Sequence, residues 1–277
     1  MKSFARLAAV LSFLGLSTTL LALQRNTFPP QQQRGGFQYG YNSQFAPVDE
    51  KAEFIFSRLR YSSGGGGDYF GDYGGFRRGG GWAEDYPKAE RQLVQGIRRL
   101  TRLDARSYEQ VVDADSEDFD NMPWLYAVNV GYWNFSPEQA KRLREYLLKG
   151  GFMVVDSFHG DAEWQSFMNG MRQILPDRQP DEIQNNDEIF HVLYDLDQRF
   201  QIPGYQYIGT GRTYESNGFV PHWRAIRDDK GRIMVLICYN MHLGDAWEHA
   251  DDPRYPERFS SLAYRLAINY IVYGMTH

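Results

Sequence analysis

The sequence predicts an α/β protein with a parallel sheet, and three consecutive segments carry that prediction. Residues 137–149 have a helical pattern and end in a glycine pair, residues 152–156 are an apolar run, and residues 162–174 are amphipathic. Ser136 is a typical N-cap, followed by proline at the first helical position and glutamine three residues later. Asp161 is expected to cap the second helix. A helix, a buried strand and a helix in succession are typical of layered α/β domains.

Three elements are predicted before this unit. Phe54–Leu59 is an apolar strand that we expect in the centre of the sheet. Residues 88–100 predict a helix, because their leucine and isoleucine side chains recur on one face. Leu125–Val130 has the composition of a second buried strand. The acidic segment 107–120 surrounds a valine pair, and we assign it no element.

The second half of the chain predicts a β-hairpin and a long terminal helix. Residues 225–227 and 232–238 are apolar runs joined by an Asp-Asp-Lys-Gly turn. The second run is the most apolar in the chain, so we expect it inside the sheet. A short helix or turn is expected near residues 188–191, and a turn at residues 209–212. A helix over residues 259–273 should pack on one sheet face.

Composition limits the class of protein. The chain has 277 residues, a net charge of -5 and a single cysteine. Its lysines and arginines are scattered rather than clustered, which argues against a nucleic-acid partner. Because Cys238 has no second cysteine to pair with, no internal disulfide can form and the core must supply the stability. The length fits one large domain, and we predict a single α/β domain over residues 51–277.

The first fifty residues are predicted to lie outside that domain. Residues 1–23 resemble a secretory signal peptide, because Lys2 and Arg6 precede an apolar run. The run is slightly short for a membrane span, so an uncleaved N-terminal anchor is the alternative. Residues 24–50 are rich in Gln, Pro, Asn and Gly and predict a disordered tether. We therefore expect an exported protein, periplasmic or membrane-anchored and facing the periplasm, with the N-terminal segment as its membrane contact.

A glycine-dominated segment at residues 62–82 interrupts the predicted domain. Aromatic residues and two arginines lie among its glycines. It lacks the Gly-Lys-Ser/Thr ending of a phosphate-binding P-loop and does not match the dinucleotide fingerprint. The composition favours a flexible surface loop, and a lid over a neighbouring site is the alternative.

The candidate binding residues lie at predicted strand ends. In open α/β sheets, ligands gather beyond the carboxyl ends of the strands. The residues that this rule selects are Arg58, Arg60, Asn129, Asp156, Ser157, His159, Asn240 and Asp245, with Trp82 and Asp85 as possible additions. The six that we retain as candidate ligand-binding residues are Arg58, Asp85, Asp156, His159, Asn240 and Asp245. Together they would form a polar edge of mixed charge, suited to a small polar ligand, with the glycine-rich segment as cover. Asp156 has an equal claim to a structural role, as a helix cap or an acceptor of backbone donors.

No nucleophile is recognised from the pattern. Ser157 and Cys238 lie at the ends of apolar runs, but neither has the small neighbours that a nucleophile elbow requires. Ser157 and His159 are too close in sequence for a productive pair to be assumed. Cys238 is more simply a small buried strand residue. Whether the protein is an enzyme stays open at this stage.

No metal or other cofactor is predicted. Histidine, aspartate and glutamate occur at residues 156–159 and 242–249, two loops that the topology could bring together. These residues lack the regular ligand spacing of a metal motif. The simpler interpretation is a hydrogen-bonded loop, with His242 and His249 at the surface.

A series of short motifs runs from about residue 54 to residue 273. They are Trp82–Pro87, Leu147–Phe152, Val155-Asp156, Glu163-Trp164, Gly231-Arg232, Asn240, Gly244-Asp245 and Asn269–Tyr273. In this order they resemble the bacterial family called domain of unknown function 4159. That family is similar in fold to class I glutamine amidotransferase-like domains, so the resemblance implies a flavodoxin-like, mostly parallel sheet with helices on both faces. Amidotransferases use a cysteine at an elbow, which this chain lacks, so glutaminase activity is not expected.

The leading functional hypothesis is an exported, non-catalytic binding domain of the bacterial cell envelope. Its partner would be a small polar ligand or an envelope protein. The alternative is a hydrolase of cell-envelope glycan or peptide, with Asp156 or Asp245 as general base and His159 as its partner. A third hypothesis is a structural assembly module, which needs only the aromatic-rich surface.

Overall fold

The computed structural model describes residues 51–63 and 81–277, apart from the side chains of Glu117 and Asp118. The predicted signal or anchor at 1–23, the predicted tether at 24–50 and most of the glycine-rich segment lie outside the described residues. Among the described helices, none is long and apolar enough to cross a membrane.

A mostly parallel sheet forms the centre of the domain. Its seven strands lie in the order β3-β1-β4-β6-β9-β8-β7. They are β1 (Ser57–Arg60), β3 (Gln110–Asp113), β4 (Trp124–Val128), β6 (Phe152–Asp156), β7 (Asp181–Glu182), β8 (His222–Arg227) and β9 (Ile233–Tyr239). Neighbouring strands from β3 to β9 pair in parallel, whereas β8 runs antiparallel to both β9 and β7. A separate antiparallel pair joins β2 (Ser62–Ser63) to β5 (Trp133–Asn134).

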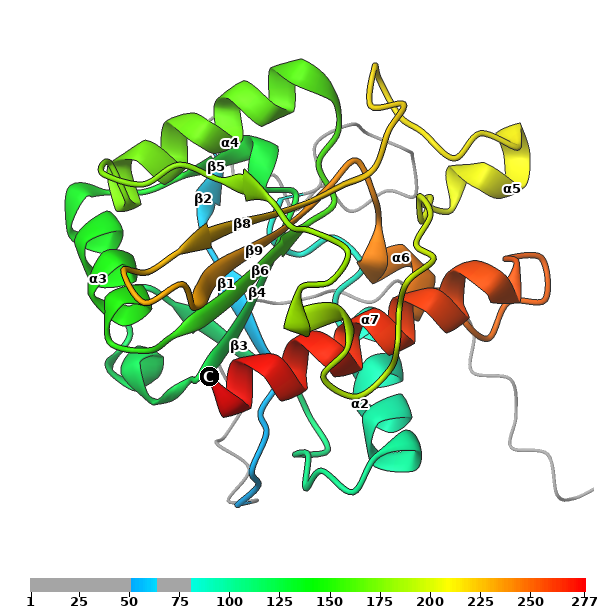
Figure 1. Ribbon diagram of the computed structural model, residues 1–277, viewed down its shortest axis with the longest axis horizontal. Coiled ribbons are helices and arrows are strands. Elements are labelled where there is room, and N and C mark those ends of the chain that lie inside the picture. Colours follow the sequence, from blue (N-terminus) through cyan, green and yellow to red (C-terminus); the bar gives the residue numbers. More distant parts are fainter. Residues whose placement is uncertain (1–50, 64–80) are drawn as a thin grey trace, which may run out of the picture. The chain divides into compact units, whose positions relative to one another are not determined.

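Helices cover both faces of this sheet (Figure 1). One face carries α2 (Lys88–Leu100), α6 (Leu243–Glu248) and α7 (Glu257–Thr276). The other carries α3 (Pro137–Leu148) and α4 (Gly160–Ile174). The remaining helical segments are α5 (Gln206–Thr210) and the 3-10 helices Glu117–Asn121, Val130–Tyr132 and Glu188–Phe190. The predicted α/β class with a mostly parallel sheet is therefore confirmed.

Local sequence signals explain the best-predicted elements. Helix α2 has the predicted bounds, and its buried side chains recur along one face. Helix α3 begins at a complete capping box, in which Ser136 and Gln139 satisfy each other's backbone donors. All residues of β6 and of β9 are buried, as expected for strands covered on both faces. The predicted hairpin is β8 and β9.

Two predictions of local structure differ from the structure, and two elements were not predicted. Strand β1 lies next to the edge strand β3 rather than centrally. Helix α4 begins at Gly160, with His159 at the N-cap position, so Asp161 lies in its first turn and does not cap it. The backbone donors there are instead satisfied by Asn240 and Asn217, which lie far away in sequence. Strand β3 and helix α6 were not predicted.

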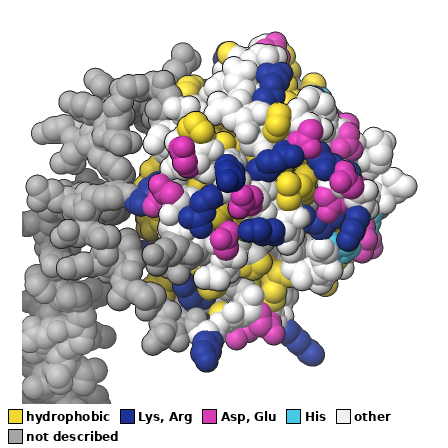
Figure 2. All heavy atoms as spheres, turned by 90° about the vertical axis from the view of Figure 1, so that its left-hand side faces the viewer, with side chains coloured by type: hydrophobic (Ala, Val, Ile, Leu, Met, Phe, Trp, Pro, Cys, Tyr) yellow, Lys and Arg dark blue, Asp and Glu magenta, His cyan; other side chains and the backbone are white. Residues whose placement is uncertain are grey.

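Charges alternate in sign on the face that carries α3. Figure 2 shows basic and acidic side chains interspersed there rather than gathered by sign. Arg142 pairs with Asp120 at 3.5 Å, and Arg144 pairs with Asp177 at 2.6 Å. Because these pairs are partly exposed to solvent, each contributes little to stability.

Candidate functional site

Strained backbone gathers at the carboxyl edge of the sheet. Asn129, Ser157 and Asn240 are the first residues after β4, β6 and β9, and their φ angles are 56°, 59° and 64°. Asp85 and Ser216, in two loops beside this edge, have φ angles of 62° and 49°. No other non-glycine residue in the described part of the chain is left-handed. Because such strain persists only where surrounding structure enforces it, its concentration marks a candidate functional site.

A cavity of about 400 Å³ lies at this edge. That volume falls within the range of small-molecule sites. Its lining comes from several loops and is mostly polar: Glu84, Asn129, Tyr132, Ser157, His159, Glu163, Gln206, Thr210, Arg212, Tyr214, Glu215, Ser216 and His242. Three carboxyl groups, two imidazoles and one arginine contribute to this lining. Carboxylate oxygens and imidazole nitrogens can together bind a cation.

His159 is the one of the six retained candidates that lines the cavity, where it is joined by the strand-exit residues Asn129 and Ser157. It is 5% exposed, and neither ring nitrogen has a hydrogen-bond partner among the described residues. Its ring lies 4.6 Å from the His242 ring, centroid to centroid. Burial and the neighbouring His242 lower the pKa of His159 to about 3, so its imidazole is neutral at physiological pH. A buried polar group without a partner costs stability, which points to a ligand that it binds.

His242 links the ends of two strands and a distant loop. Its Nδ1 lies 3.0 Å from Ser157 Oγ, and its Nε2 lies 3.0 Å from Glu215 Oε1. Burial alone lowers the pKa of His242, but the bond to Glu215 and the carboxylates of Asp245 and Glu84 outweigh it and raise the pKa well above its usual value. His242 is 6% exposed, so the expectation of a surface position was wrong.

Asp156 is fully buried and serves as a structural acceptor. Its Oδ2 accepts hydrogen bonds from the Tyr126 hydroxyl at 2.8 Å, from Leu243 N at 2.7 Å and from Gly244 N at 3.1 Å. Ser157 Oγ also donates to it at 3.2 Å. These bonds fix the first turn of α6, and the structure does not pair Asp156 with His159. Burial raises the pKa of Asp156.

Arg58 anchors the segment around Trp82 and Glu84 by hydrogen bonds. Its guanidinium forms a fully buried ion pair with Glu90 and donates to the carbonyl oxygens of Trp82 and Glu84, both at 3.1 Å. Burial raises the pKa of Glu90 and outweighs the opposing effect of Arg58. Arg58 therefore holds Glu84 at the cavity wall rather than facing a ligand itself.

Asp85 and Asp245 form an acidic pair behind the cavity. They share a hydrogen bond, and Asp245 Oδ2 also accepts from Tyr205 N at 2.6 Å. Burial, with Asp245 and Glu84 close by, raises the pKa of Asp85 well above its usual value. A second carboxyl group this close disfavours the ionised form of Asp85. A side chain at Gly244 would collide with the Asp85 carboxylate, which explains the glycine.

Asn240 shapes the site without lining the cavity. Its side-chain oxygen accepts from Gly160 N at 2.9 Å, and its amide donates to Val220 O at 2.7 Å. It thereby joins the start of α4 to the loop before β8. Five of the six predicted candidates thus lie around this edge of the sheet, whereas Arg58 lies within β1. Of the six, only His159 lines the cavity.

Sequence reasoning missed most of the cavity lining. Glu84 and Glu215 come from loops with no periodic pattern, and Glu163 lies in α4 as an ordinary helical glutamate. Ser157 was set aside because its neighbours are not small, yet it takes the left-handed turn between β6 and α4. The usable signal was the repeated polar residue directly after each buried strand.

Glu84 makes the stability of the site dependent on pH. Burial, with Asp245 and Glu215 nearby, raises the pKa of Glu84 from 4.5 to about 7. The folded state therefore binds more protons than the unfolded state between these values, so stability falls as the pH rises from about 4.5 to about 7, and the full cost of Glu84 is present above pH 7. In EDTA at pH 8, Glu84→Gln is expected to raise the free energy of unfolding by about 2 kcal/mol, with no gain at pH 4.5.

Urea unfolding at several pH values measures this difference. Glu257→Gln, on the exposed first turn of α7, is the matched control and should change stability by less than about 0.5 kcal/mol at each pH. An equal gain for Glu84→Gln at both pH values would show that Glu84 is not held protonated.

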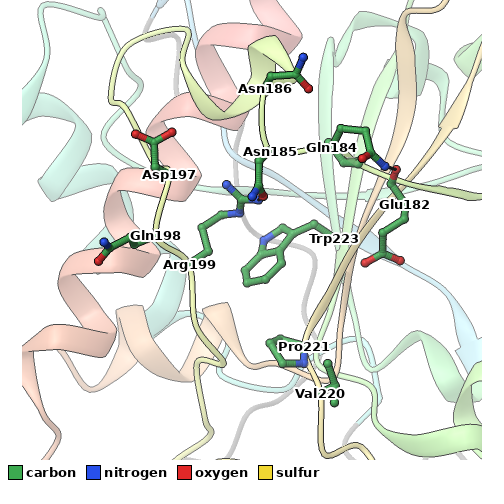
Figure 3. A pocket seen from close by; sticks show the side chains of 11 residues that line it. Glu182, Gln184, Asn185, Asn186, Asp197, Gln198, Arg199, Val220, Pro221 and Trp223 are labelled. Atoms are coloured by element: carbon green, nitrogen blue, oxygen red, sulfur yellow. Dashed lines mark hydrogen bonds between the residues drawn. The ribbon is translucent and has the colours of Figure 1, made fainter.

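A larger cavity, of about 810 Å³, lies beside the edge strand β7 (Figure 3). Arg199 lies against Trp223 there, and its guanidinium carbon is 3.5 Å from the Phe190 ring centre. Arg199 also donates to Asn185 at 2.6 Å, and Glu182 accepts from Arg224 at 3.0 Å. Because none of the left-handed non-glycine residues lines it, this cavity is the weaker candidate.

Two groups of described residues have the composition of a metal site. One is His159, Glu215 and His242, and the other is Asp245, Glu248 and His249. The first group lines the cavity and spans three loops. The second lies on one short helix and its C-cap.

The structure defines an α/β protein whose polar site lies beyond the carboxyl ends of its parallel strands. Residues 56–275 match the family model described as Domain of unknown function (DUF4159), and the chain belongs to this family. The comparison with curated proteins found no match.

Proposed function

We propose that this chain is an exported, non-catalytic binding domain of the bacterial cell envelope whose carboxyl-edge cavity takes a small polar ligand with positive charge. The observation that carries the proposal is His159, buried at the cavity wall with both ring nitrogens unpaired among the described residues. Glu84, Glu163 and Glu215 surround the same space and supply negative charge. Neutral imidazole and carboxylate oxygen together suit a cation.

The strand order supports a flavodoxin-like fold, similar to class I glutamine amidotransferase-like domains. Numbered along the chain, the five parallel strands β1, β3, β4, β6 and β9 lie in the order second, first, third, fourth, fifth. This is the flavodoxin order, in which ligands bind beyond the carboxyl ends of the strands. The position of the cavity agrees with that rule.

A hydrolase is the second candidate, and Ser157 is the observation that favours it. Ser157 lies at a left-handed turn between a strand and a helix, as nucleophiles in α/β hydrolases do. His242 contacts its hydroxyl, and Glu215 contacts the other ring nitrogen. In this alternative, His242 would take the Ser157 proton as general base. The raised pKa of His242 opposes that role, because a protonated imidazole cannot accept a proton.

His159→Phe separates the binding proposal from a structural role. Phenylalanine keeps an aromatic ring but removes two unpaired polar atoms, so the variant without additive is expected to unfold at the same temperature as wild type or at a higher one. Binding should nevertheless be lost. Thermal unfolding of the full chain with 1,4-diaminobutane, with zinc chloride and without additive measures both effects.

In wild type, an additive at one hundred times its Kd should stabilise the fold by about 2.7 kcal/mol, and this gain should vanish in His159→Phe. Equal stabilisation of both proteins would contradict the proposal. Turnover of an ester or amide probe that Ser157→Ala abolishes would favour the hydrolase instead.

A further inference from the structure

Two histidines and a glutamate meet at the wall of the cavity. His159 follows β6, His242 follows β9, and Glu215 lies in the loop before β8. One potential ligand atom from each lies within 4.8 Å of the other two. Building on the binding function proposed above, we propose that these three side chains hold a divalent transition-metal ion of the zinc type. Two imidazoles and one carboxylate form a known catalytic-type zinc ligand set that leaves a coordination position open.

His159 provides an independent indication of a ligand. Its side chain is 5% exposed and lines the cavity, and neither ring nitrogen has a partner among the described residues. A hydrogen-bonded structural histidine would have at least one of these nitrogens paired. A metal ion takes the lone pair of a neutral imidazole directly, so it would satisfy the group that the folded chain leaves unpaired.

The surroundings of His242 are those of a metal ligand. Its Nδ1 faces Ser157 Oγ at 3.0 Å, and Ser157 donates in turn to the buried Asp156 at 3.2 Å. Metal-bound histidines usually donate their second ring nitrogen to such a partner, which fixes the ring and its tautomer. The other nitrogen, Nε2, then faces Glu215 at 3.0 Å. A metal ion would replace the proton that these two atoms share.

The ligand types restrict which ion fits. Imidazole nitrogen favours zinc, copper, nickel or iron, whereas magnesium and calcium prefer oxygen ligands throughout. Glu84 and Glu163 also line the cavity and balance the charge of a divalent ion. We therefore expect zinc or cobalt to bind in preference to magnesium.

Isothermal titration of the EDTA-treated full chain with zinc chloride tests this site. One zinc ion per chain is expected, with magnesium chloride producing no comparable signal. His159→Phe should weaken zinc binding by more than about 100-fold, and Ser157→Ala, which removes a supporting contact, by about 10–100-fold. Thermal unfolding in EDTA verifies that each variant is folded.

His249→Phe is the matched control, because His249 belongs to the other candidate group, with Asp245 and Glu248. It should leave zinc affinity within about 3-fold of wild type, well below the 10-fold effect of a lost supporting contact. Zinc binding that survives His159→Phe or that disappears in His249→Phe would overturn the proposal, as would no binding at all.

The same set of proteins separates this inference from the broader function. One outcome is that 1,4-diaminobutane stabilises wild type but not His159→Phe, while zinc does not bind. The cavity is then a binding site for organic cations, and only the metal inference is wrong. If His159→Phe changes the binding of neither 1,4-diaminobutane nor zinc, both the proposed function and the metal inference are wrong.

Discussion

Arg58→Met is expected to lower the free energy of unfolding by about 3–5 kcal/mol, because it leaves the Glu90 carboxylate buried without its partner. Both side chains are fully buried in the native state. The same change removes the donors to the carbonyl oxygens of Trp82 and Glu84. Urea unfolding measures the loss, and Arg142→Met, which breaks an exposed ion pair, should cost less than about 1 kcal/mol.

A double variant identifies the source of that loss. Arg58→Met with Glu90→Leu removes both charges, and most of the lost stability is expected to return. Cation binding should stay weak, because Glu84 is no longer held at the cavity wall. A double variant as unstable as Arg58→Met would show that the unpaired carboxylate is not the cause.

Asp156→Ala is expected to cost at least about 3 kcal/mol, because four buried donors lose their acceptor. These donors are the hydroxyl groups of Tyr126 and Ser157 and the backbone N–H groups of Leu243 and Gly244. The first turn of α6 would lose its anchor to β6. The measurement is again urea unfolding of the full chain.

Asp156→Asn is the matched control for this position. Its amide oxygen can keep the acceptor role of Oδ2, and its amide nitrogen would replace Oδ1, which has no partner among the described residues. The expected cost is below about 1.5 kcal/mol, with zinc affinity retained. If Asp156→Asn lost zinc binding while its stability stayed unchanged, Asp156 would instead coordinate the zinc ion directly. That result would contradict its place behind the cavity.

Elements with complete local signals were predicted well. The capping box at Ser136 and the one-sided periodicity of residues 88–100 fix α3 and α2 without help from distant residues. Strand β3 was missed because four residues at the edge of a sheet are too few to show a clear alternation of apolar and polar side chains. Helix α6 was missed because it is short and its first turn depends on Asp156, a residue far away in the sequence.

The difference between local and distant signals also explains which parts of the candidate site could be predicted. The rule that ligands gather at the carboxyl ends of parallel strands led to the edge where the polar cavity lies, because the rule depends on the fold class alone. Which side chains face the cavity depends on tertiary contacts that periodicity does not encode. Asp156 turns toward α6 and Arg58 toward Glu90, whereas Glu215 reaches the site from a loop without a pattern.

The central claim is that His159, beside His242, has a neutral imidazole without a hydrogen-bond partner among the described residues and that this imidazole binds a cation. Two-bond proton–nitrogen NMR spectra of the histidine rings test it most directly. At pH 6 without metal, we expect a neutral His159 and a doubly protonated His242, and zinc should shift a ring nitrogen of each. A His159 that titrates near pH 6.5, or spectra that zinc leaves unchanged, would contradict the account.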